Sequence, residues 1–196
     1  MIAIRDIEEA LAGCWRIAFG DATATRHFDL TADGFWRSFR LAGILAACDA
    51  VDATVGHFAG FDGSTEDAGL GAAIWVFIVA GITSLITFCA FPLVVAGAAR
   101  PMGLAARYAP YVTVRNWLAF FLSFPIYLLN AITYAGWLPI DVIGLFVLSF
   151  EVVVLLAGYS VARVVLGAPQ SIAVGLSLMD FLLALVIAKL VTMLLF

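Results

Sequence analysis

Charged residues are scarce in this chain. They make up 12% of its 196 residues, whereas 64% of the residues are hydrophobic. About a quarter of the residues of a soluble domain are charged, because its surface faces water. The composition therefore excludes an ordinary soluble enzyme and indicates an integral membrane protein.

The residues that build disulfides, metal sites and catalytic sites are also few. The cysteines Cys14, Cys48 and Cys89 are dispersed without a CxxC spacing, and the histidines His27 and His57 lie far apart. We expect neither a disulfide nor a metal site from them. The chain contains no Gly-x-Ser-x-Gly, His-Glu-x-x-His or P-loop motif, so we predict a protein that is not an enzyme and uses no cofactor. The formal net charge of −4 argues against a nucleic-acid partner.

Long hydrophobic runs are what the sequence has in place of these motifs. A helix that crosses a bilayer needs about 20 apolar residues. Four runs meet this standard, and a fifth, the first along the chain, is long enough but carries Asp49 and Asp52. The alternative for that run is a short interfacial or re-entrant helix that ends near Asp49. We predict an all-α polytopic membrane protein with five transmembrane helices, at about 37–59, 73–98, 112–133, 140–162 and 172–194.

The distribution of arginine predicts the orientation of these spans. Arginines precede the first span, separate the second from the third, and follow the fourth, whereas the two intervening loops contain neither Lys nor Arg. Positively charged loops stay on the cytoplasmic side of a membrane. The amino terminus is therefore predicted to be cytoplasmic, and an odd number of spans places the carboxyl terminus outside.

Residues 1–34 form the part of the chain that precedes the spans. Apolar residues recur at helical spacing over about 2–18, with charged residues on the other faces, which predicts an amphipathic helix on the inner leaflet or against the bundle. The rival interpretation is a helix that docks on a partner protein. A polar connector follows to residue 34, and residues 35–196 form the transmembrane domain.

Ionisable residues inside the predicted spans are the main functional candidates. Each costs roughly 2.5–3.5 kcal/mol on insertion scales, so it is retained for a reason. Asp49 and Asp52 share a face of the first span, Glu151 lies in the fourth, and Asp180 and Lys189 lie in the fifth. The positions of Asp52 and Lys189 along their helices predict similar depths, which makes them candidates for a buried ion pair.

Two hypotheses account for these charges. In the first, Asp49, Asp52 and Glu151 form a pathway for protons or cations. In the second, the charges are structural: Asp52 pairs with Lys189, and the other acids, such as Asp180, stay neutral and hydrogen-bond to nearby polar side chains, which would be Thr83, Thr87, Asn116 or Asn130.

The layout and the segment FDLTADGFWRSF, residues 28–39, resemble the Yip1-like integral membrane proteins of the bacterial type. The resemblance implies a multi-pass protein of the bacterial inner membrane that organises or assembles membrane components through helix or lipid contacts. The partners implied are the lipid bilayer and other membrane proteins or further copies of the chain. Asp49 and Asp52 depart from the apolar first span of that family. The alternative function is a small permease or channel that conducts protons or a solute past buried carboxylates.

Overall fold

The computed structural model describes residues 4–61 and 69–195, and every regular element in them is a helix. Five helices are long and apolar enough to cross a membrane, which confirms the predicted all-α fold with five spans. The direction in which they cross stays a prediction. The elements are α1 (Ile4–Ala18), η1 (Ala22–His27), α2 (Ala32–Ser38), α3 (Arg40–Phe58), α4 (Leu70–Ala99), η2 (Ala105–Arg107), α5 (Tyr108–Tyr134), α6 (Ile140–Val164) and α7 (Gln170–Leu195).

The first span is a complete helix in spite of its two aspartates. α3 continues without a break past Asp49 and Asp52 to Phe58, so the alternative of a short helix ending near Asp49 is wrong. α4 and α5 begin a few residues before the apolar runs that predicted them. They do so because an α-helix extends beyond the lipid core into polar sequence, where its backbone still forms intrahelical hydrogen bonds.

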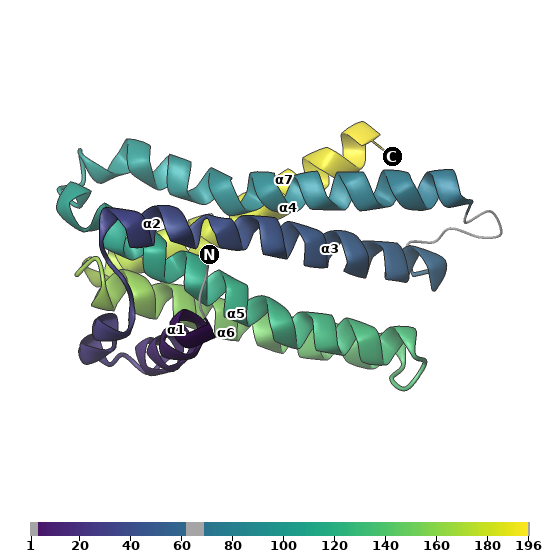
Figure 1. Cartoon of the computed structure of the whole chain (residues 1–196), viewed down its shortest axis with the longest axis horizontal. Helices are drawn as coiled ribbons and strands as arrows, with labels where there is room; N and C mark the ends of the chain where they lie inside the picture. The colour runs from purple at the N-terminus through teal and green to yellow at the C-terminus, as the bar shows by residue number, and fades with distance from the viewer. Residues whose placement is uncertain (1–3, 62–68, 196) are drawn as a thin grey trace.

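The five long helices run side by side (Figure 1), and their contacts close a ring. Going round it, α3 packs against α4, α4 against α7, α7 against α6, α6 against α5, and α5 against α3. Large apolar side chains point outward from this ring, such as Leu93 and Leu145, which are 70% and 69% exposed. Such surfaces are unfavourable in water but match the hydrocarbon of a bilayer.

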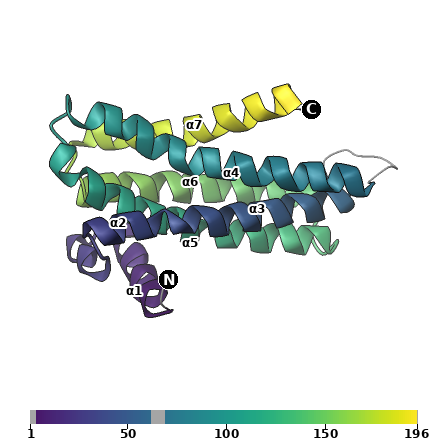
Figure 2. The same ribbon diagram turned by 45° about the horizontal axis from the view of Figure 1, so that its top comes forward.

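The two ends of the ring are packed differently. We call the end that carries α1, α2 and residues 100–107 the inner end, because the arginine distribution predicts that it faces the cytoplasm. Nearly all of the hydrophobic core lies in the half of the bundle nearest this end, with fully buried Leu41, Val112 and Val161 among its members. Towards the outer end α7 diverges from its neighbours (Figure 2). The ring is therefore closed in its inner half and more open in its outer half.

The amino-terminal helix α1 lies across the bundle axis beside the inner end (Figure 2). Its buried face, which includes Ala10, Cys14 and Ile17, packs against α5 and α6. A second apolar face, with Leu11 and Trp15, remains exposed. Of the two locations predicted for the amphipathic helix, contact with the bundle is thus observed, and α1 leaves an apolar side free for the leaflet.

The connector after α1 is more ordered than its polar sequence indicated, because it contains η1 and the start of α2. Asp21 caps η1 by accepting hydrogen bonds from the backbone N–H and the hydroxyl of Thr23, at 2.8 and 2.7 Å, and it pairs with Arg16. These contacts lower the pKa of Asp21 to about 2. Arg37 of α2 reaches back to both Asp6 and Asp29, at 3.3 and 3.4 Å. Charged contacts therefore fold the connector onto α1.

Candidate functional site

An ion pair between α5 and α7 lies within the bundle. Arg115 donates from Nε to Asp180 Oδ2 at 3.0 Å and from Nη2 to Oδ1 at 2.6 Å, a geometry with two parallel bonds. Its third nitrogen, Nη1, donates to the carbonyl oxygen of Phe88 at 3.3 Å. The guanidinium also lies 5.5 and 5.1 Å from the ring centroids of Phe88 and Phe91. One buried arginine thereby connects α4, α5 and α7.

This pair was not predicted from the sequence. Arg115 was counted among the arginines that separate the second span from the third, although the predicted third span, about 112–133, includes it, and Asp180 was left without a cationic partner. The structure begins α5 at Tyr108, which places Arg115 two turns inside the helix. The signal for it is the apolar and aromatic sequence on both sides of Arg115, since a loop arginine has no reason to be flanked by YVTV and NWLAFF.

The two aspartates of α3 are each bonded to α5. Asp49 Oδ1 accepts a hydrogen bond from the hydroxyl of Tyr127 at 2.6 Å, and Asp52 Oδ2 accepts one from Asn130 Nδ2 at 2.8 Å. Tyr127 and Asn130 are three residues apart, as the aspartates are, so one face of α5 matches one face of α3. Asn130 was expected as a partner of the acids other than Asp52, whereas in the structure it bonds to Asp52.

The predicted ion pair between Asp52 and Lys189 is wrong. Asp52 bonds to Asn130, whereas Lys189 is exposed on the diverging part of α7. The two residues have comparable positions along their helices, but α3 packs against α4 and α5 rather than against α7. Similar depth in the membrane does not bring two side chains together when their helices face different neighbours.

Asn116 and Thr83 donate their hydrogen bonds to other groups and not to the acids of the spans. Asn116 is fully buried and donates from Nδ2 to the hydroxyl of Ser38 at 3.0 Å, which joins α5 to α2. The hydroxyl of Thr83 donates to the carbonyl oxygen of Val79 within α4, at 2.7 Å. Asn116 therefore has a structural role at the inner end, away from the aspartates of α3.

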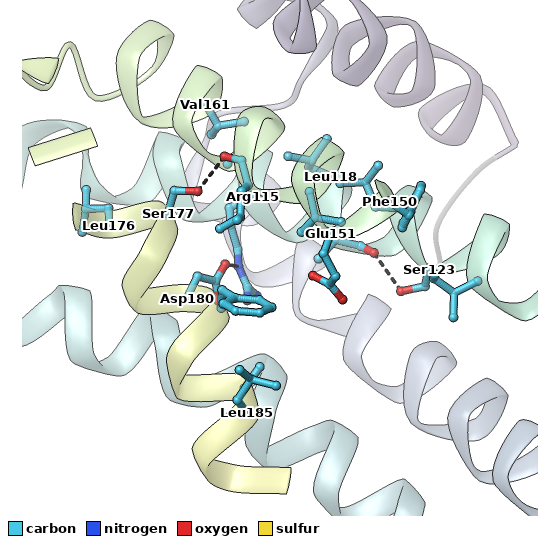
Figure 3. Close-up of a pocket in the computed structure, with 18 of the residues that line it drawn as sticks. Arg115, Leu118, Ser123, Phe150, Glu151, Val161, Leu176, Ser177, Asp180 and Leu185 are labelled. Carbon is cyan, nitrogen blue, oxygen red and sulfur yellow. Dashed lines mark hydrogen bonds and ion pairs between the residues drawn. The ribbon is translucent and has the colours of Figure 1, made fainter. Parts of the chain in front are cut away.

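A cavity of about 450 Å³ lies between α5, α6 and α7, and we call it the main cavity. The carboxylate of Glu151 extends into it from α6, towards the side where Arg115 and Asp180 meet (Figure 3). Within the described part of the chain, Glu151 has no hydrogen-bonding or ion-pair partner. Asp49 of α3 completes the charged lining. Apolar side chains form most of the remaining wall, among them Leu118, Leu122, Phe150, Leu155, Phe181 and Leu185.

A second cavity, of about 590 Å³, lies between α3, α4, α5 and α7. Asp49, Arg115 and Ser123 line both cavities, together with the small residues Ala184 and Ala188 of α7. The second cavity adds hydroxyl groups to the lining, from Thr83, Ser84, Thr87 and Thr192. The two cavities are therefore neighbouring parts of one hollow region inside the ring.

The structure brings together only part of the predicted pathway. Asp49 and Glu151 share the main cavity, whereas Asp52 lines a separate, mainly apolar groove between α3 and α5. Asp180, expected to be a secondary polar residue, belongs to the main cavity together with its partner Arg115. The candidate site is thus Glu151, Asp49 and the Arg115–Asp180 pair.

Comparison of the chain with protein-family models, with curated proteins and with solved structures finds no match. The resemblance to Yip1-like proteins therefore stays a prediction.

The lining of the main cavity carries more negative than positive charge. Arg115 balances Asp180, which leaves Asp49, stabilised by Tyr127, and Glu151 without a cationic partner. A carboxylate in a poorly hydrated cavity is stabilised by a bound proton or by a cation. No group of three or more His, Cys, Asp or Glu side chains among the described residues could hold a metal ion. The arrangement is suited to protons or to cations that need no rigid set of ligands.

Proposed function

We propose that this integral membrane protein is a small permease or channel that conducts protons or a small solute through the hollow region of its helix ring. Glu151 is the central binding group, and Asp49 is the second. The observation that carries the proposal is the position of the Glu151 carboxylate, which faces a cavity inside the bundle and has no partner among the described residues.

The other charges inside the bundle have structural partners. Asp180 is held by Arg115, Asp49 by Tyr127 and Asp52 by Asn130. Glu151 stabilises no helix contact of this kind, although an ionisable group at such a depth costs roughly 2.5–3.5 kcal/mol on insertion scales. A cost that folding does not recover supports a role in binding or transport.

The uneven packing of the ring agrees with this function. A transporter has to close its cavity on one side of the membrane while it is open on the other. Here the core fills the inner half of the bundle, whereas α7 diverges from its neighbours towards the outer end. We interpret this arrangement as a state that is closed towards the predicted cytoplasmic side.

The test is proton flux into liposomes that contain the purified protein and a pH-sensitive dye, driven by an imposed potential. We expect flux in the wild-type protein and its loss in Glu151→Gln, with a smaller effect in Asp49→Asn. The matched control is Asp52→Asn, because this carboxylate lies outside the main cavity. Wild-type flux that persists unchanged in Glu151→Gln would contradict the proposal, as would the absence of proton and solute flux under every gradient.

A second candidate is a membrane organiser of the Yip1-like kind in the bacterial inner membrane. The observation that favours it is the exposure of large apolar side chains in α1, α2 and the connector between them, where Trp15, Phe19 and Trp36 are 69%, 75% and 69% exposed. An organiser would use this surface on lipids or on another membrane protein. It would retain its cellular function in Glu151→Gln and Asp49→Asn, whereas a permease would lose it.

A further inference from the structure

The size of the main cavity exceeds what a proton pathway requires. Protons move along hydrogen-bonded side chains and waters, and a bare ion is enclosed by a few ligand atoms. A space of about 450 Å³ lies instead in the range of sites that enclose small organic molecules, which is roughly 300–1,000 Å³. The volume therefore points to a molecular ligand.

The wall of the cavity indicates the body of that ligand. Aliphatic side chains from α5, α6 and α7 form about half of the lining, and the rings of Phe150, Phe181, Tyr111 and Tyr127 add an aromatic part. Charged side chains occupy four of the lining positions, and hydroxyl groups occupy four more. A lining of this kind binds a hydrocarbon or aromatic body and leaves one or two points for a polar group.

The charges of the cavity select the sign of that polar group. Arg115 is the one cation among the described residues of the lining, and its Nε, Nη1 and Nη2 already donate to Asp180 and to the carbonyl oxygen of Phe88. It is therefore committed to the protein and poorly placed to hold an anion. Glu151 and Asp49 are the carboxylates that remain, and a cation over the ring of Phe150 or Phe181 would gain a cation–π contribution.

We propose that the main cavity binds a small organic cation, a compound with an ammonium group and an apolar body, with the ammonium group beside Glu151. The inference rests on the proposed function and names the class of solute that it would carry. Because a proton on Glu151 removes the charge that attracts the ligand, proton and organic cation compete for the same carboxylate. Binding is therefore expected to weaken as pH falls.

Calorimetric titration of the full chain in detergent micelles with benzyltrimethylammonium tests this site, and neopentylbenzene is the neutral probe of the same shape. We expect saturable binding of the cation and at least tenfold weaker binding of the neutral compound. Glu151→Gln should weaken cation binding more than tenfold, whereas Asp52→Asn should keep it within about twofold. Equal affinity for both probes, or full affinity in Glu151→Gln, would overturn the proposal.

A second variant keeps the test decisive if Glu151→Gln does not fold. Ala184 lines both cavities, so Ala184→Phe fills the space without changing a charge and should abolish binding of the cation. Retained binding in a folded Ala184→Phe protein would place the ligand elsewhere and overturn the site.

The same liposomes separate this inference from the proposed function. Proton flux that depends on Glu151, combined with no binding of the cation, would overturn the organic-cation site and leave the permease standing. Cation binding that depends on Glu151, without flux of protons or of the cation, would support the site and reject the permease.

Discussion

Arg115 of α5 and Asp180 of α7 form an ion pair with two hydrogen bonds inside the bundle, at 3.0 and 2.6 Å. The side chain of Arg115 is 11% exposed and that of Asp180 is 30% exposed. Because α5 and α7 are not neighbours in the chain, the pair fixes the position of the last span relative to the third. It also fixes one wall of the main cavity.

Loss of either partner of this pair is expected to destabilise the protein strongly. Arg115→Met leaves Asp180 without its counter-charge, and Asp180→Asn leaves a buried guanidinium, each at a cost of about 3–5 kcal/mol. The double variant should lose clearly less than the sum of the two single changes. Thermal unfolding in detergent measures this, with Lys189→Met as a control that changes stability by less than about 0.5 kcal/mol. Additive losses would show that the two charges do not interact.

The hydrogen bond between Tyr127 and Asp49 should hold α3 against α5. Tyr127→Phe removes the hydroxyl and keeps the ring, so Asp49 loses its partner at a cost of about 1–3 kcal/mol. Ser149→Ala is the control, since the Ser149 hydroxyl bonds only within its own helix, to the carbonyl oxygen of Leu145. Chemical denaturation in mixed micelles compares the two variants. Equal stability of both would mean that the bond makes no net contribution.

The contact between α1 and the connector depends on a glycine. A Cβ added at Gly13 would lie 2.5 Å from Cε2 of Phe28 and 2.9 Å from Cβ of His27, so Gly13→Ala should displace the connector. Overpacking of this kind costs about 1–3 kcal/mol. We expect faster proteolysis between residues 19 and 31, whereas Gly43→Ala, where the added Cβ meets no atom within 4 Å, should cleave like wild type. Unchanged proteolysis of Gly13→Ala would contradict the close contact.

The connector should loosen in acid. The pKa of Asp21 is lowered to about 2 by hydrogen bonds from Thr23 and Arg16, so its contribution to stability is complete above its ordinary value near 4. That contribution is lost as pH falls from about 4 through about 2. The protection factor of the Thr23 amide against hydrogen exchange should fall over this window in wild type. In Asp21→Asn the protection factor of this amide should be low at every pH. Wild-type exchange with no change in protection below pH 4 would exclude the Asp21 cap as its cause.

Part of the candidate site could be predicted from single residues. Asp49 and Glu151 were expected to belong to one pathway because both are ionisable residues within apolar runs, and the structure places both in the main cavity. Asn130 was expected to bond to one of the other acids but bonds to Asp52. Arg115 was missed because it was counted with the cytoplasmic arginines, although it lies inside the predicted third span, and its partner Asp180 depends on how α5 packs against α7.

The sequence by itself determined that this is an all-α membrane protein with five spans, since a run of about 20 apolar residues has no other stable form across a bilayer. It also predicted similar depths for Asp52 and Lys189, because an α-helix rises by about 1.5 Å per residue. Only the tertiary structure decided which charges meet. The rotation and tilt of each helix depend on side-chain packing across the ring. As a result, Lys189 is exposed, Arg115 pairs with Asp180, and a cavity lies beside Glu151.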